Sequence, residues 1–225
     1  MARLSYPQAG QPRPAALPPE TRTVGQVVAE SIRIYGEHFR PALLLGIGPA
    51  MLAVLAANVS RTVSFVLAPT LSAVLVSASF VGACVLVLDV RPPRNRLVLA
   101  WIVGWLVFIP VPFLALAFVL PALAWLAAVG LVVPVLIVEG LLPRAAFRRA
   151  WKLARAGYVH VLGSIVTLAI VVFLTQAVLG FILRGAGGVA ISTAFFLANV
   201  IISPLLFIGS ALLYVDQRAR VTGTG

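Results

Sequence analysis

The residues of this chain that could bind a charged ligand are concentrated in one short stretch. Residues 138–157 read VEGLLPRAAFRRAWKLARAG, with a single acidic residue, Glu139, and apolar blocks on either side. The five basic residues in it are Arg144, Arg148, Arg149, Lys152 and Arg155. Cations at this density attract anionic groups, and beside a membrane those groups are lipid headgroups. The alternative is that the charges only keep this loop in the cytoplasm.

The same stretch has the pattern of an amphipathic helix. Pro143 suits a first helical turn, where its missing N–H would be unpaired anyway. At about 100° per residue, one stripe consists of Arg144, Arg148, Lys152 and Arg155, with Arg149 beyond them. The adjacent stripe consists of Phe147, Ala150, Trp151, Ala154 and Tyr158. We therefore predict a helix over about 143–158 in the plane of the inner leaflet, with Trp151 toward lipid and the cations toward headgroups or a protein partner.

A second amphipathic helix is expected over about 24–39. Thr23 and Gln26 have the spacing of a capping box. Glu30, Arg33 and Glu37 have the spacing of two ion pairs along one face. Because each of the two amphipathic helices precedes a pair of apolar segments, a weak parallel repeat is a further hypothesis.

Residues for catalysis or metal binding are scarce. The chain holds two histidines, one cysteine and six acidic residues. His38 and His160 both precede apolar segments, where an interfacial histidine is the ordinary interpretation. No set of these residues has the spacing of metal ligands. We therefore expect no metal, no cofactor and no catalytic residue, and interpret the protein as a non-enzyme.

The expected spanning segments contain few polar residues. Gln176 and Asn199 lie deep in them, and either an interhelical hydrogen bond or a contact to a polar substrate would explain both. Glu139, at the end of a span, is expected to pair with Arg144, Arg148 or an arginine of a neighbouring loop. An intramembrane polar contact would favour a transporter.

The composition places these residues in a membrane protein. The chain has 225 residues, of which 61% are hydrophobic and 10% charged, against roughly 25% charged in soluble domains. We predict an all-α, polytopic protein with six transmembrane helices and two cytoplasmic interfacial helices. The six expected spans are 41–59, 63–88, 97–118, 121–138, 159–183 and 189–215. Small residues four apart in the second span, such as Ala73 and Ser77, predict close helix packing.

The distribution of charge predicts the orientation of the spans. With six spans, 15 of the 17 basic residues fall on one side, and only Arg61 and Arg184 on the other. The positive-inside rule then places both termini in the cytoplasm. The net charge of +11 is thereby explained without nucleic acid. Arginine-rich composition suggests a bacterial cytoplasmic membrane. We expect residues 1–22 to be a disordered, proline-rich tail without a signal peptide, 23–220 the membrane domain, and 221–225 a flexible end.

Residues 132–157 carry a resemblance to a known family. VVPVLIVEGLLPRAAFRRAWKLARAG resembles the signature of the glycerophosphoryl diester phosphodiesterase membrane-domain family, through Pro134, Glu139, Gly140 and Gly157. The segments VGQVVAESIRIYGEHFRPALLLG and LLYVDQRAR are similar to its two ends. In that family the phosphodiesterase activity resides in a separate soluble barrel, for which this chain has no room.

These observations favour an integral membrane component that acts as a scaffold or contacts lipids, a protein partner or a second copy of itself. The alternative is a small transporter or channel for a neutral or lipid-like substrate.

Overall fold

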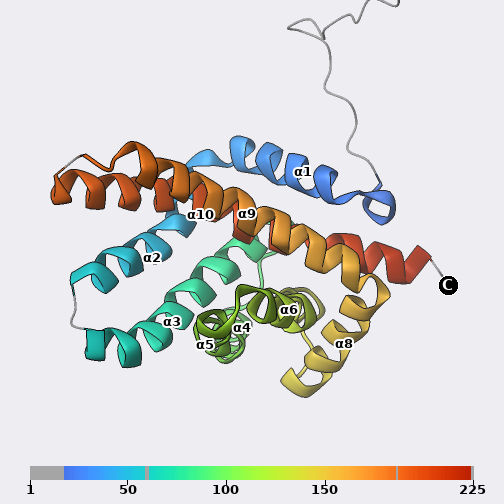
Figure 1. Ribbon diagram of the computed structural model, residues 1–225. Helices are drawn as coiled ribbons and strands as arrows, with labels where there is room; N and C mark the ends of the chain where they lie inside the picture. The colour runs from blue at the N-terminus through green and yellow to red at the C-terminus, as the bar shows by residue number, and fades with distance from the viewer. Residues whose placement is uncertain (1–17, 59–60, 186, 224–225) are drawn as a thin grey trace, which may run out of the picture.

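The chain is built from helices, as predicted. The computed structural model describes residues 18–58, 61–185 and 187–223, and it has no strand among them (Figure 1). A 3-10 turn, η1 (Pro19–Thr21), precedes ten helices in the described residues: α1 (Val24–Glu37), α2 (Phe39–Asn58), α3 (Arg61–Leu88), α4 (Arg94–Phe108), α5 (Pro110–Ala117), α6 (Val119–Val129), α7 (Val132–Glu139), α8 (Pro143–Ala156), α9 (Tyr158–Ile182) and α10 (Gly188–Gly223). Most of the expected tail, residues 1–17, and residues 224–225 lie outside the described residues.

Five helical segments are long and apolar enough to cross a membrane. They are Pro69–Leu88, Arg94–Ala117, Val119–Glu139, Tyr158–Ile182 and Gly188–Thr222. The polytopic membrane fold is therefore confirmed. The segment expected as the first span is helix α2, in which the apolar stretch found among the described residues, Phe39–Leu52, is shorter than a full span.

Two of the spans are broken helices that form a hairpin. Pro110 begins α5 directly after α4, because a proline tolerates the first turn of a new helix. The chain reverses at Phe118, which is extended (φ −158°, ψ 144°), and α6 packs back on α5. The third and fourth expected spans, 97–118 and 121–138, placed the turn between them near residues 119–121, and the structure has it slightly earlier, at Phe118. Continuing α6, α7 is buried from Val132 to Ile137.

Helix α10 passes through the centre of the molecule and contacts α2, α3, α9, α1 and α8 (Figure 1). Its closest approach is to α2 at Gly46, where a Cβ would overlap the Val200 carbonyl. That carbonyl lacks its usual helical donor, since Pro204 four residues later has no N–H. Gly46 therefore lets the α2 backbone pack against a carbonyl that lacks its helical hydrogen bond. Ser77 shows similar packing between α3 and α4, because its hydroxyl donates to the Trp101 carbonyl at 2.7 Å.

Helix α1 lies alongside α10 and runs antiparallel to it. Arg22, just before α1, pairs with Asp216 near the end of α10. Tyr35, near the end of α1, donates from its hydroxyl to the carbonyl of Ile201, earlier in α10, at 2.8 Å. Val27 is fully buried in this contact. Part of α1, which was predicted to be an interfacial helix, thus packs on protein.

The local interactions predicted for α1 are confirmed. The Thr23 backbone N–H donates to Gln26 Oε1 at 2.7 Å, as in a capping box. Arg33 pairs with both Glu30 and Glu37. The hydrogen bonds from Arg33 hold the pKa of the Glu30 carboxyl below its usual value. Both amphipathic helices end two residues earlier than expected, at Glu37 and Ala156.

The close approach at Gly46 makes a prediction about stability. We expect Gly46→Ala to lower the free energy of unfolding by about 1–3 kcal/mol, because the new methyl group must push two backbones apart. The measurement is the thermal unfolding midpoint of the protein in a mild detergent. Gly36→Ala is the matched control, since nothing lies within 4 Å of a Cβ at Gly36, and there the better helix propensity of alanine should stabilise slightly. Equal midpoints for the two variants would contradict the packing contact.

Candidate functional site

Helix α8 presents three different faces. Ala146, Ala150, Leu153 and Ala154 are buried against α6, α7 and α10. Beside this small-residue face, the side chains of Phe147 and Trp151 are 38% and 51% exposed. The predicted apolar stripe therefore divides into two parts. Its alanines and Tyr158 lie on the protein, together with Ala146 and Leu153, while Phe147 and Trp151 face outward.

The third face carries the basic residues. Arg144, Arg148, Lys152 and Arg155 are all exposed and form what we call the basic face of α8. No carboxylate of a described residue lies within salt-bridge distance of any of the four. They are therefore available to an anion from outside the molecule.

Arg149, the fifth predicted residue, has a different environment. It is half-buried, and its Nε lies 3.2 Å from Glu139 Oε2. The Tyr214 hydroxyl donates to Glu139 Oε1 at 3.1 Å. Glu139 was expected to pair with Arg144, Arg148 or a loop arginine. Arg149 takes that place because it borders the buried face of α8 and so points toward the end of α7.

Two glycines of the stretch that resembles the family signature shape the turns on either side of α8. Gly140 adopts a left-handed conformation (φ +64°), which glycine favours, and the Arg96 guanidinium packs against it. Gly157 lies between α8 and α9, where a Cβ would be 3.0 Å from Gln217 Oε1. Pro134 is buried inside α7. The motif residues therefore build the passage from α7 through α8 to α9.

A second polar cluster joins the start of the described chain to its last helix. Arg22 Nη1 lies 2.9 Å from Asp216 Oδ1, and the two side chains are 8% and 0% exposed. Arg220 Nη2 donates to the Arg22 carbonyl at 2.9 Å. His160, expected to be interfacial, places Nε2 3.9 Å from Asp216 Oδ2. Gln217 is fully buried, and its amide has no hydrogen-bond partner among the described residues.

Sequence reasoning missed this cluster, which we call the Asp216 cluster. The last span was expected to end at residue 215, so that Asp216 and Gln217 were read as loop residues. The apolar pattern in fact continues through Val215 and Val221, which pack at the margin of the core. That continuation was the available signal that the helix extends past the charges.

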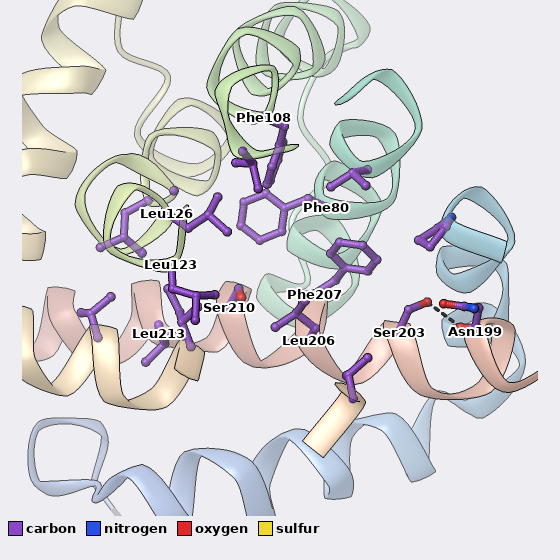
Figure 2. A pocket seen from close by; sticks show the side chains of 18 residues that line it. Phe80, Phe108, Leu123, Leu126, Asn199, Ser203, Leu206, Phe207, Ser210 and Leu213 are labelled. Carbon is purple, nitrogen blue, oxygen red and sulfur yellow. Dashed lines mark hydrogen bonds between the residues drawn. The ribbon is translucent and has the colours of Figure 1, made fainter. Parts of the chain in front are cut away.

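A cavity of about 330 Å³ lies between the spanning helices (Figure 2). Residues of α2, α3, α4, α5, α6, α9 and α10 surround it, and nearly all of them are apolar. Its polar side chains are Asn199, Ser203 and Ser210, all on α10, and no charged residue lines it. The three lie along one wall, and Asn199 stands at one end of the view (Figure 2).

The expected hydrogen bond between Gln176 and Asn199 is not formed. Asn199 Nδ2 instead donates to the Phe195 carbonyl of its own helix at 2.9 Å. The side-chain amide of Gln176 has no hydrogen-bond partner among the described residues. Asn199 lines the cavity, whereas Gln176 does not.

No protein-family model, curated protein or solved structure matches the chain. The resemblance of residues 132–157 to the membrane-domain family stays a prediction.

Arg149 and Arg148 are neighbours with different expected effects on stability. Arg149→Gln removes the cationic partner of the partly buried Glu139, so we expect it to lower the free energy of unfolding by about 1–2 kcal/mol. Arg148→Gln is the matched control and should change it by less than about 0.5 kcal/mol, as for an exposed side chain without a partner. Thermal unfolding in the same detergent measures both. If both variants lose the same free energy of unfolding, the loss comes from removing one positive charge, and the Glu139–Arg149 pair adds no stability of its own.

Proposed function

We propose that this protein is a non-enzymatic component of a membrane that binds anionic lipid headgroups through the basic face of α8. The observation that carries this proposal is the group of four exposed, unpaired cations, Arg144, Arg148, Lys152 and Arg155, beside the exposed Trp151. Within the described residues, their charge is not balanced by any nearby carboxylate.

The three faces of α8 suit a helix at the edge of a bilayer. The small-residue face fixes the helix against the bundle, so α8 does not depend on lipid for its position. Phe147 and Trp151 have the character of side chains that enter the boundary between headgroups and acyl chains. The basic face then lies at the level of the phosphates, where each cation contributes on the order of 1 kcal/mol of attraction.

The position of the chain ends supports six crossings. The Arg22–Asp216 pair holds the segment before α1 to the end of α10, so both lie at the same end of the molecule. An even number of crossings is required to return the chain to that end. Five helices meet the length criterion, and α2, of 20 residues, is about 30 Å long and supplies the sixth.

Charge supports the direction of insertion. The shared end carries the basic face of α8 together with Arg22 and Arg220, and the opposite loop carries Arg184. By the positive-inside rule that end is cytoplasmic. We place the protein in a bacterial cytoplasmic membrane on the basis of this charge pattern and its arginine-rich composition.

The structural roles of the motif residues fit a membrane component better than an enzyme. Glu139 is engaged by Arg149 and Tyr214, and Gly140 and Gly157 are required by backbone geometry and close packing. The second candidate function is a transporter or channel for a lipid-like substrate, and the apolar cavity between the spans favours it. A protein partner or a second copy of the chain is the alternative occupant of the basic face.

The headgroup proposal is tested by comparing two double variants of equal charge. Arg148→Gln with Lys152→Gln removes half of the basic face of α8. Arg91→Gln with Arg94→Gln removes the same charge from exposed positions outside α8. Native mass spectrometry of the protein, equilibrated with vesicles of phosphatidylglycerol and phosphatidylcholine, gives the bound anionic lipid. We expect the α8 variant to lose about tenfold or more in phosphatidylglycerol binding, from two contributions of ~1 kcal/mol.

The control variant should bind phosphatidylglycerol nearly as the wild type does. If both variants lose the same amount of phosphatidylglycerol binding, the effect comes from net charge alone. The basic face of α8 is then not a headgroup site. A protein that co-purifies with the wild type and is lost with the α8 variant would make the basic face an anchoring surface instead.

The orientation is tested by labelling single cysteines. With the native Cys84 replaced by alanine, we introduce Glu20→Cys, Arg184→Cys and Thr222→Cys, which are exposed positions. An impermeant maleimide added to intact cells should label only the cysteine at 184, while those at 20 and 222 should react after permeabilisation. If the cysteines at 20 and 222 lie on opposite sides, α2 does not cross the membrane.

A further inference from the structure

We propose that the cavity between the spans holds one hydrocarbon chain of a membrane lipid, drawn from the leaflet next to α8. This inference uses the position of α8 at the membrane surface, which is part of the proposed function. It does not use the charges of the basic face, so the two ideas fail in different experiments.

The chemistry of the lining selects an apolar occupant. Phe80, Leu123, Ile165 and Phe207 contribute to its walls, and no charged side chain does. Its polar groups are largely satisfied within α10: the Ser203 hydroxyl donates to the Asn199 carbonyl at 2.6 Å, and Asn199 Nδ2 donates to Phe195. Water needs two to four polar partners to occupy a cavity, and apolar cavities stay dry or take apolar ligands.

The length and volume of the cavity suit an extended hydrocarbon chain better than a compact molecule. Along α10 the lining extends from Asn199 to Leu213, which is about 21 Å of helix at 1.5 Å per residue. A volume of about 330 Å³ spread over that length is narrow. It accommodates one extended chain, and it is too narrow for two chains side by side.

The cavity reaches the end of the bundle at which α8 lies. Helix α10 has 36 residues and is about 54 Å long, so it exceeds the ~30 Å hydrocarbon core. The cavity follows only the part of α10 from Asn199 to Leu213. The Leu213 end lies beside α6 and α9, which both contact α8. A lipid with its head near α8 would therefore extend its tail toward Asn199.

The expected affinity is modest, since the chain leaves an apolar bilayer for an apolar cavity. The gain comes from dispersion contacts with walls that would otherwise face a void. Occupancy is high because the bilayer supplies chains at high concentration. The test must therefore be made in a membrane and not after dilution in detergent.

The experiment uses photoactivatable chains with the full-length protein in phosphatidylcholine vesicles. One probe is a phosphatidylcholine with a diazirine on its acyl chain, and the other is a single-chain fatty alcohol with the same group. After irradiation, labelled residues are located by peptide mass spectrometry. We expect labels on the buried Phe207 and on Ser210, which lines the cavity, besides labels on lipid-exposed residues such as Phe173.

A variant that fills the cavity distinguishes labelling by a chain bound in the cavity from labelling by bulk lipid. Ser210→Phe places a ring in the cavity and should lower labelling of Phe207 about tenfold, as expected when the ring takes the space of the bound chain. Ser210→Ala is the matched control, in which Phe207 should be labelled as in the wild type. Phe173 should be labelled equally in all three proteins. Should Ser210→Phe fail to fold, Leu206→Ala, which widens the cavity, should raise Phe207 labelling at least about twofold.

Two results would overturn the inference. One is that Phe207 is not labelled in the wild-type protein. The other is that neither Ser210→Phe nor Leu206→Ala changes the labelling of Phe207. Labelling by the phosphatidylcholine probe identifies a resident lipid of the bilayer. Labelling by the alcohol probe alone identifies a free single-chain lipid. Neither result changes when Arg148 and Lys152 are neutralised, which keeps this test independent of the headgroup proposal.

Discussion

The structure depends on helix backbones approaching α10 more closely than side chains would allow. Between helices in lipid there is little hydrophobic driving force, so association relies on contact and on hydrogen bonds. Gly46 brings α2 against the Val200 carbonyl, and Gly209 brings α10 against Leu168 of α9 and Ser31 of α1. Gly157 does the same for Gln217 at the polar end. Helices α1, α2 and α9 thereby pack around α10.

The charged side chains of the molecule fall into two groups, one paired inside the bundle and one exposed on α8. Glu139 and Asp216 face inward and are held by Arg149, Tyr214 and Arg22, with little exposure to an outside ligand. Buried pairs of this kind contribute little net stability compared with apolar packing, but losing one partner is costly. They fix how the end of the bundle closes. The four cations of the basic face of α8 are exposed and have no carboxylate partner among the described residues, and these are the groups proposed to meet an external anion.

Much of the fold could be predicted from the sequence, because lipid imposes long apolar segments that are separated by charge. The helical hairpin around Phe118, the capping of α1 and the Glu30–Arg33–Glu37 pairs all followed from spacing within one segment. What could not be predicted were contacts between distant segments. Nothing in the spacing of Arg22 and Asp216 indicates that they meet, since 194 residues separate them. The partner of Glu139 was misassigned because helical spacing ranks Arg144, Arg148 and Arg149 almost equally until α7 fixes the direction.

The pairing of the first and last parts of the chain has a consequence for its synthesis. Val27 and Ser31 are fully buried, and part of what covers them is α10. A ribosome adding about 5–20 residues per second needs roughly 10–40 s to make the 194 residues between Arg22 and Asp216. Through that interval α1 has emerged but has no intramolecular partner along this face. Its apolar side must then be sheltered by the bilayer surface or by the insertion machinery, and the helix reaches its final place only when translation is nearly complete.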